Sequence, residues 1–293
     1  MDWDKIIKEA SDKYMKPYLA AKRDVEFINQ HLSDNGLITK LTDYQENFIL
    51  ETHLNRNVVV HKCRQAGYTT VLLALAFCKL WFRYMNDPLG NRLNTKVLFV
   101  SPNAQMANDA KEKFLRIAAS MKLPEGSVLM PLMVEERLQM VRSRIVFAHP
   151  GNVHNKLCGT MYTDAYFDEF AFIDNIDEIY TCFVGGGPID SNAVFATSFD
   201  DKRKEKTIRI TDNLVHHGAK FIETHWYELP KYNKNLVWKK YKVEPTIDEE
   251  GNIKYDKEHF DKMISDGWIP TSQAYEKLSE MIGPDNAKSE LLN

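Results

Sequence analysis

The chain has 293 residues, of which 44% are hydrophobic and 27% charged, a composition that excludes an intrinsically disordered chain and suffices for one large domain. Its 38 Lys and Arg residues nearly balance its 41 Asp and Glu residues, so any contact with a polyanion must be local or shared among subunits. No segment reaches the ~18 consecutive apolar residues of a membrane span, and the N-terminus is acidic where a signal peptide is basic. We therefore expect a soluble, intracellular protein without membrane contact.

The hydrophobic pattern predicts helices that alternate with strands. Residues 2–31 are expected to form a polar, amphipathic helix ahead of the core, and a turn-forming run at 33–36 ends it. The expected core elements are helix 43–54, strand 58–60, helix 69–85, strand 97–100, helix 103–121, strands 145–148 and 165–168, helix 175–183 and strand 193–196. Because continuous apolar strands between helices indicate a parallel sheet covered on both faces, the predicted class is α/β with a mostly parallel sheet.

The composition shifts towards Lys, Tyr, Trp, Asp and Glu beyond about residue 215. In this part the expected elements are a strand at 221–225, a hairpin around 249–252, and helices at 256–265 and 271–282. We therefore expect an N-terminal helical adaptor at 1–40, an α/β core at 41–215 and a small lid subdomain at 216–293. The four cysteines are far apart without a CxxC pair, which argues against a zinc site or a disulfide framework.

The segment from Val58 to Thr70 predicts a buried strand, a short loop and a helix, which is the context of a phosphate-binding loop. The pattern G-x-x-x-x-G-K-[ST] is met at Gly67 and Thr69, but Tyr68 occupies the lysine position and Lys62 that of the first glycine. An ammonium from Lys62 can still reach the phosphate cradle. The expected nucleotide-binding residues of this segment are Lys62, Cys63, Arg64, Gln65, Ala66, Gly67, Tyr68, Thr69 and Thr70. Taken alone, the segment is more simply interpreted as an ordinary strand–turn–helix.

A second candidate is the apolar strand that ends in Asp168 and is followed by Glu169. A carboxylate at the carboxyl edge of a parallel sheet can hold Mg²⁺ together with the Thr69 hydroxyl, and the next carboxylate can orient an attacking water. An Asp-Glu pair after an apolar run is common by itself. In a P-loop fold, however, we expect this strand to lie beside the strand that precedes the loop, so both segments predict one crevice.

Two further segments complete the pattern. The apolar strand 193–196 leads into Thr197 and Ser198, which are placed to sense the terminal phosphate, although a simple strand cap has the same sequence. Tyr44 and Gln45 open the helix before the phosphate-loop strand, where a glutamine amide can pair with the adenine edge. Basic residues at 202–204, 206 and 239–240 are candidate DNA contacts, although such runs are more often solvated surface.

In this order, the segments resemble the ATPase domain of the large terminase subunit of tailed bacteriophages, which belongs to the additional-strand class of P-loop ATPases. The resemblance covers residues 40–215 and rests on four motifs. These are D-Y-Q at 43–45, R-Q-x-G-x-T-T at 64–70, D-E-x-A-F-I at 168–173 and A-T-S at 196–198. One branch of the family carries K-x-x-x-x-G-Y-S, which Lys62 to Thr69 matches with Thr for Ser. The resemblance therefore implies that Lys62 replaces the usual lysine. An arginine-glycine pair often precedes the acidic strand, whereas this chain has Cys158 and Gly159 there, with Lys156 nearby.

The resemblance implies an ATP- and Mg²⁺-dependent motor that moves double-stranded DNA into a viral procapsid. Its expected partners are the portal protein, a small terminase subunit and further copies in a ring, commonly of five, in the host cytoplasm and transiently at the portal vertex. Family members usually continue into a nuclease, which we do not expect within this chain, so a nuclease domain or a separate nuclease subunit is a further partner.

Position assigns the roles within this interpretation. Lys62 and the loop amides hold the β- and γ-phosphates, Thr69 and Asp168 bind Mg²⁺, Glu169 orients the water, and Arg64 stabilises charge in cis. Two alternatives remain. A helicase-like DNA-dependent ATPase would need a second RecA-like domain, for which 216–293 is short. A non-hydrolysing DNA- or portal-binding scaffold would explain the irregular loop.

Overall fold

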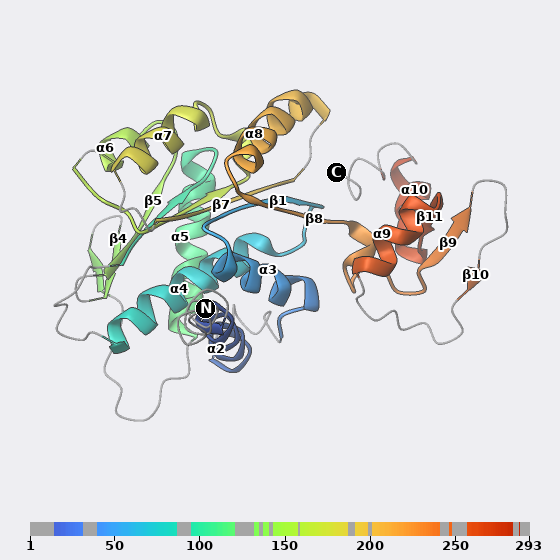
Figure 1. Cartoon of the computed structure of the whole chain (residues 1–293), viewed down its shortest axis with the longest axis horizontal. Helices are drawn as coiled ribbons and strands as arrows, with labels where there is room; N and C mark the ends of the chain where they lie inside the picture. The colour runs from blue at the N-terminus through green and yellow to red at the C-terminus, as the bar shows by residue number, and fades with distance from the viewer. Residues whose placement is uncertain are drawn as a thin grey trace, which may run out of the picture.

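A computed structural model gives the fold of the chain (Figure 1). It describes residues 15–31, 40–86, 95–120, 132–134, 137–140, 143–157, 159–186, 191–198, 201–240, 246–247, 257–283 and 287. The first part of the expected N-terminal helix, the expected hairpin at 249–252 and Cys158 lie outside these residues. No helix among them is both long and apolar enough to cross a bilayer.

An eight-stranded sheet with the order β3-β4-β5-β2-β6-β7-β1-β8 lies at the centre. Its strands are β1 Asn57–Lys62, β2 Lys96–Val100, β3 Leu132–Val134, β4 Arg137–Met140, β5 Ser143–Ala148, β6 Asp164–Asp168, β7 Asn192–Ser198 and β8 Lys220–Thr224. The strands from β5 to β8 in that order run parallel, and β3 and β4 extend the sheet as an antiparallel pair. The predicted α/β class with a mostly parallel sheet is confirmed.

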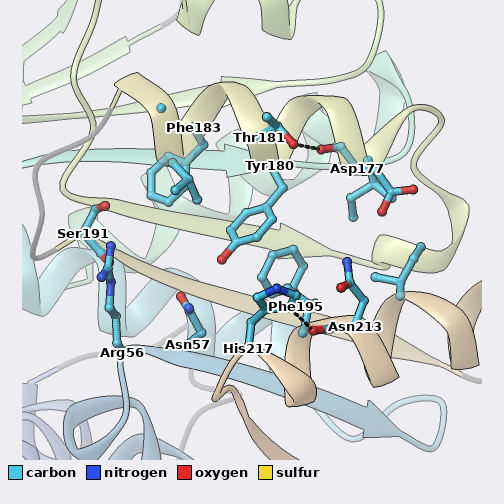
Figure 2. A pocket seen from close by; sticks show the side chains of 15 residues that line it. Arg56, Asn57, Asp177, Tyr180, Thr181, Phe183, Ser191, Phe195, Asn213 and His217 are labelled. Atoms are coloured by element: carbon cyan, nitrogen blue, oxygen red, sulfur yellow. Dashed lines mark hydrogen bonds between the residues drawn. The ribbon is translucent and has the colours of Figure 1, made fainter.

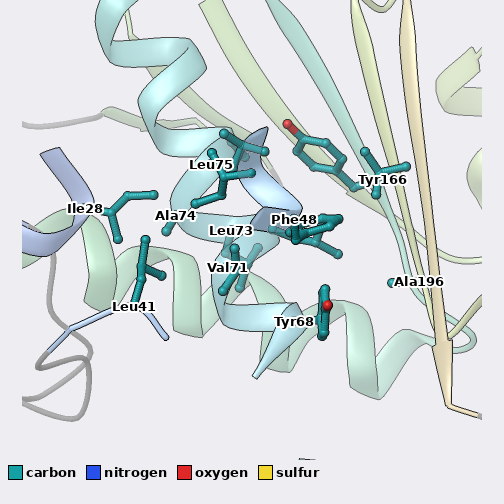
Figure 3. Close-up of a cluster of buried hydrophobic side chains, with 14 of the residues drawn as sticks. Ile28, Leu41, Phe48, Tyr68, Val71, Leu73, Ala74, Leu75, Tyr166 and Ala196 are labelled. Atoms are coloured by element: carbon teal, nitrogen blue, oxygen red, sulfur yellow. The ribbon is translucent and has the colours of Figure 1, made fainter. Parts of the chain in front are cut away.

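Helices cover both faces of this sheet (Figure 1). One face carries α2 Lys16–His31, α3 Asp43–Leu54, α4 Tyr68–Asn86 and α5 Ala104–Ala119; the other carries α6 Val153–Leu157, α7 Ile176–Gly186 and α8 Lys204–His216. Successive strand residues enter opposite cores, as the period of two requires: Val194 joins the α4 side and Phe195 the α7 side. Figure 3 shows part of the first core, to which Phe48, Tyr68 and Leu73 belong. Burial on both faces explains why the strands are continuous apolar runs.

A small second part follows β8. It contains the three-stranded antiparallel sheet β10-β9-β11 and two helices. Their bounds are β9 Val237–Lys240, β10 Thr246–Ile247, α9 Lys257–Ser265, β11 Trp268–Thr271 and α10 Gln273–Ile282, after the short 3-10 helix η4 Trp226–Glu228. The Trp226 ring stacks on Tyr275 at 5.2 Å between centroids, and Phe260 lies in the same apolar cluster as α3 and α4. The large sheet extends through β8, beyond the compositional shift at 215, while the division into domains stays a prediction.

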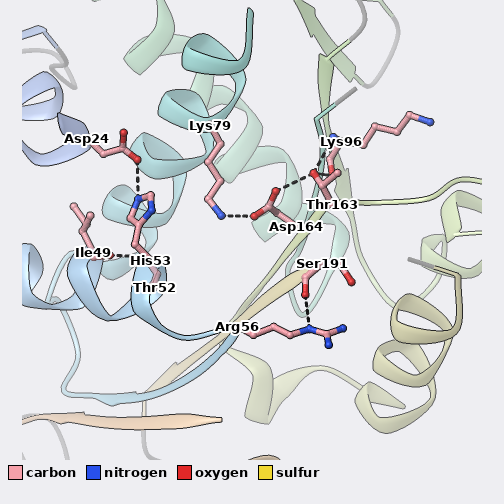
Figure 4. A network of polar contacts seen from close by, with 10 residues as sticks. All are labelled: Asp24, Ile49, Thr52, His53, Arg56, Lys79, Lys96, Thr163, Asp164 and Ser191. Atoms are coloured by element: carbon pink, nitrogen blue, oxygen red, sulfur yellow. Dashed lines mark hydrogen bonds and ion pairs between the residues drawn. The ribbon is translucent and has the colours of Figure 1, made fainter. Parts of the chain in front are cut away.

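Buried charges join the helices of the first face to each other and to the sheet (Figure 4). The Lys79 ammonium on α4 is paired with Asp164 at the beginning of β6, and the Thr163 hydroxyl donates to the same carboxylate at 2.9 Å. Asp24 on α2 is fully buried and accepts from Arg23, while His53 on α3 lies 2.9 Å from its second oxygen. Charged side chains are buried only when paired in this way.

Candidate active site

Three parallel strands end at one edge of the sheet and bring the predicted motifs together. Lys62 is the last residue of β1, Asp168 of β6 and Ser198 of β7. The expectation that β1 and β6 lie side by side was wrong, because β7 separates them: Lys62 is in register with Ser198, and Asp168 with Ala196. The apolar run of β7 is buried on both faces, which suits it to this interior position.

Lys62 and Glu169 form a buried ion pair at this edge. Only 6% of Lys62 is exposed, and its ammonium donates to Glu169 Oε1. Burial alone would lower the pKa of Lys62, but the charges of Glu169 and Asp168 raise it above its usual value. Burial alone would raise the pKa of Glu169, but Lys62 and hydrogen bonds from Ser198 hold it below its usual value. Both groups are therefore ionised at neutral pH.

The second oxygen of Glu169 faces β7. Glu169 Oε2 accepts from the Ser198 backbone N–H and hydroxyl, both at 2.8 Å, and from the Thr197 hydroxyl at 3.4 Å. The Glu169 backbone is left-handed, with φ of 54° and ψ of 48°, which is uncommon for a residue other than glycine and concentrates at functional sites. The predicted coupling residues thus contact the carboxylate that was predicted to orient water.

Asp168 and Thr69 meet beside this pair. The Thr69 hydroxyl donates to Asp168 Oδ2 at 2.7 Å. Asp168 is 3% exposed, and its Oδ1 has no hydrogen-bond partner among the described residues. Burial raises the pKa of Asp168 despite the opposing charge of Lys62. A buried carboxylate oxygen without a partner, next to a hydroxyl, fits an oxygen-ligated divalent cation such as Mg²⁺.

The loop between β1 and α4 is held in shape by the beginning of α3. Gln65 and Gly67 have positive φ of 62° and 77°, and a Cβ on Gly67 would lie 2.8 Å from the Gln45 side-chain nitrogen. The carbonyl of Ala66 accepts from the Tyr44 hydroxyl at 2.8 Å and from Gln45 Nε2 at 3.1 Å. Tyr44 and Gln45 therefore fix the loop, while their role towards adenine stays a prediction.

The Cys63 backbone and the Tyr68 side chain both contact the edge strand β8. The Tyr68 hydroxyl lies 2.7 Å from that of Thr224, and its ring packs edge-on against Phe48 at 4.9 Å. The Cys63 N–H donates to the Thr224 carbonyl at 3.0 Å, and burial raises the pKa of its thiol to about 12. Tyr68, in the usual lysine position, is thus a core side chain, and Lys62 supplies the positive charge beside Asp168 and Glu169.

The remaining loop residues lie at the surface. Arg64 and Gln65 are exposed, and Gln65 Oε1 accepts from the Tyr232 hydroxyl at 3.0 Å and from the Lys231 ammonium. Thr70 lines a cavity of about 260 Å³ that also borders Gln45 and Gly67. Sequence reasoning missed the contacts of Thr224, Lys231 and Tyr232, because no local pattern connects these residues to a loop more than 150 positions earlier.

The predicted basic residues differ in their contacts. The Lys206 ammonium donates to the Ile173 carbonyl at 2.7 Å, and the Arg203 guanidinium lies 4.4 Å from the Phe172 ring centroid. Both hold the segment that follows Glu169. Lys202, in the 3-10 helix η3 Asp201–Arg203, and Lys204, the first residue of α8, are exposed. Lys239 and Lys240 lie in β9, and their side chains are outside the described part of the chain.

A parallel sheet with a strand–loop–helix turn, a hydroxyl and two carboxylates at its carboxyl edge defines the P-loop ATPase class of folds. Among solved structures, the HK97 bacteriophage large terminase is similar with a TM-score of 0.51 and 14% identity, over 73% of this chain and 45% of that chain. This chain thus spans less than half the length of that terminase. The predicted resemblance to phage large terminases is confirmed at the level of the fold.

Two looser likenesses have TM-scores below 0.5. The large terminase of a thermophilic bacteriophage, in complex with ADP, scores 0.46 at 9% identity, over 82% of this chain and 48% of that chain. S. cerevisiae Dbp5 bound to RNA and ADP BeF3 scores 0.43 at 12% identity, over 72% and 51%. No family model and no curated protein matches the sequence. At these identities the comparisons establish the fold alone.

Proposed function

We propose that this chain is an ATP-hydrolysing motor that translocates double-stranded DNA into a viral procapsid, corresponding to the ATPase part of a large terminase. The proposal rests on the meeting of separate sequence segments at one sheet edge, where Lys62 pairs with Glu169 and Thr69 bonds Asp168. An ordinary strand–turn–helix does not need a buried lysine that faces two carboxylates, because burying these charges costs free energy.

The proposed roles follow from this geometry. The Lys62 ammonium and the N–H groups at the beginning of α4 hold the β- and γ-phosphates, since a helix N-terminus favours anions. Thr69 and Asp168 would hold Mg²⁺, which neutralises charge on the phosphate oxygens when bound. Arrival of the phosphates competes with Glu169 for the Lys62 ammonium. Glu169, once released, accepts a hydrogen bond from the attacking water and orients it.

Phosphate release is proposed to reach the rest of the molecule through Glu169. Its contacts with Thr197 and Ser198 join the acidic strand to the end of β7, which leads into η3 Asp201–Arg203 and α8. A change in the position of Glu169 therefore alters hydrogen bonds at the beginning of the segment that carries Lys202 and Lys204. Many molecular switches work in this way: a terminal phosphate orders a protein segment, and loss of the phosphate releases it.

The base is proposed to occupy the cavity of about 260 Å³ beside Gln45, Gly67 and Thr70. This cavity lies next to the loop, so a nucleotide can reach from it to the phosphate site. The proposed partners are double-stranded DNA, a portal protein, a small terminase subunit, and a nuclease domain or nuclease subunit. Further copies in a ring, of five when docked, would share the DNA contact that the balanced charge of one chain does not supply.

The direct test is ATP hydrolysis by the chain with Mg²⁺, measured with and without duplex DNA. We expect ATP hydrolysis that duplex DNA stimulates. We expect Lys62→Ala to reduce the rate at least ~100-fold, because the positive charge that contacts the phosphates is lost. Lys277→Ala, an exposed lysine on α10, is the matched control and should leave the rate unchanged. Parental turnover by Lys62→Ala would exclude the assigned role of that lysine.

The same assay separates the two alternatives. Stimulation by single-stranded nucleic acid and not by duplex DNA would favour a helicase-like ATPase. Nucleotide or DNA binding without any hydrolysis, in the folded protein with Mg²⁺, would favour the non-hydrolysing scaffold.

A further inference from the structure

A second cavity, of about 540 Å³, lies between α7 and α8 (Figure 2). Arg56 and Asn57 reach it from the beginning of β1, and Ser191 from just before β7. A cavity of this size is suited to a ligand of the size of a drug or a nucleoside. No motif in the sequence points to this site, and the proposed ATP chemistry does not use it.

The inner wall of this cavity is apolar and partly aromatic. It is formed by Phe195 of β7, Phe183 of α7 and Leu214 of α8, all of them buried. The Tyr180 ring meets Phe195 edge-on at 5.1 Å between centroids and projects into the space shown in Figure 2. Such a wall favours a flat apolar ring system, because rings pack against one another edge-on or offset.

Polar groups converge on the opposite side of the cavity. The Arg56 guanidinium donates through Nε to the Ser191 carbonyl at 3.0 Å, which uses one of its donors. Burial raises the pKa of Tyr180, which Arg56 partly opposes, so its hydroxyl is a neutral hydrogen-bonding group. The other charged residue among the described lining residues, Asp177, is paired with Arg209 at 2.6 Å. Arg56 therefore favours one anionic group at this side.

The charges along the cavity argue against a polyphosphate here. α8 lines it with its last turns, where a helix carries partial negative charge. α7 lines it from its first turn to Gly185 near its end, and the Asp177 carboxylate lies in that first turn. Among the described lining residues, Arg56 is the one Lys or Arg side chain, which suits one anionic group rather than a polyphosphate.

We propose that this cavity is a binding site for a small amphipathic monoanion, a flat apolar ring system that bears one carboxylate or sulfonate. The rings lie against Phe183 and Phe195, and the anionic group pairs with Arg56. The proposal is independent of ATP hydrolysis, because none of the residues that line this cavity belongs to the proposed ATP site.

The probe for this site is 8-anilinonaphthalene-1-sulfonate, an aromatic monoanion whose fluorescence rises on transfer from water to an apolar site. We expect saturable binding to the unmodified chain. Gly185→Trp should weaken it at least about tenfold, because Gly185 lines the cavity and a Cβ there meets no atom within 4 Å, so the indole can fill the mouth. Gly186→Trp, whose Cβ is equally unobstructed, lies outside the lining and should bind the probe as the parent does.

A second pair of variants tests the charge. Arg56→Gln should weaken binding of the probe about tenfold, which is about 1.4 kcal/mol, and reduce its salt dependence. Binding of the neutral analogue N-phenyl-1-naphthylamine should change much less. Arg116→Gln, on α5 at the other face of the sheet, is the control. Circular dichroism and thermal unfolding establish that each variant is folded.

The proposal is overturned by either of two results. One is parental affinity in folded Gly185→Trp. The other is an equal loss of the probe and of its neutral analogue in Arg56→Gln, which would show that Arg56 does not recognise the anion. If Gly185→Trp does not fold, the Arg56→Gln comparison alone decides.

Discussion

Lys62 lies at the end of a buried strand, and its ammonium has a carboxylate partner in the structure. In the proposed reaction the same ammonium binds the phosphates, so Glu169 and the nucleotide compete for it. In this proposal the competition would weaken nucleotide affinity and would hold Glu169 in its ion pair while no phosphate is present. A lysine on the strand would thus differ from a lysine on the helix, because it would restrain the carboxylate as well as bind the substrate.

We predict that Glu169→Gln abolishes hydrolysis while sparing ATP binding. Loss of the carboxylate removes the group that orients water, a loss of at least ~100-fold in rate, and it removes the anion that competes for Lys62. Binding of a fluorescent ATP analogue and release of phosphate are the measurements. Glu112→Gln, an exposed residue of α5, is the control. Hydrolysis by the folded variant at the parental rate would refute the assignment.

The Lys79–Asp164 pair connects α4 to the beginning of β6, and both side chains are largely buried. We predict that Lys79→Met lowers the free energy of unfolding by about 3–5 kcal/mol, because the Asp164 carboxylate stays buried without its cation. Urea unfolding measures the change. Arg209→Met breaks an exposed pair with Asp177 and should cost at most about 1 kcal/mol. Equal losses in the two variants would contradict the prediction.

Sequence reasoning predicted the buried strands and their helices, because apolar runs and helical periods are local signals. It missed α8, whose buried face includes Thr207 and Thr211 and is therefore only partly apolar. It missed β11, where Pro270 within the short strand weakens the strand pattern. It also missed α6 and the β3–β4 pair, which are short.

The candidate site was predictable in its residues but not in its contacts. The strand ends at Lys62, Asp168 and Ser198 follow from apolar runs that stop at polar residues. The position of β7 between the other two strands depends on tertiary pairing, which no single segment encodes. The same holds for Tyr68, whose hydroxyl partner is on β8, so its irregular place in the motif became understandable only with the fold.

For the whole molecule, a formal net charge of −3 means that duplex DNA can be held only by local positive surface. Lys202 and Lys204 are exposed near the end of β7, whereas Lys206 bonds the Ile173 carbonyl. The predicted basic residues at 202–206 therefore have two roles. Lys202 and Lys204 are candidate DNA contacts, whereas Lys206 holds the segment that follows Glu169.

We predict that DNA affinity falls steeply with salt, and that Lys202→Gln/Lys204→Gln reduces the slope of log K against log salt by about 2. Lys206→Gln should leave this slope nearly unchanged and should lower thermal stability instead, because its hydrogen bond to the chain is lost. Fluorescence anisotropy of labelled duplex DNA over a salt series provides the measurement. An unchanged slope in the double variant would remove these two lysines from the DNA contact.

Strand β7, which lies between β6 and β1, also sets the distance between Lys62 and Asp168. Because Lys62 and Asp168 belong to strands that do not touch, their separation across the sheet spans two interstrand spacings, ~10 Å in all. That width is fixed by backbone hydrogen bonds and not by any side chain. The interval between Lys62 and Asp168 is thus a property of the sheet. The loop that joins β1 to α4 can change in sequence without altering the distance that the proposed substrate would bridge.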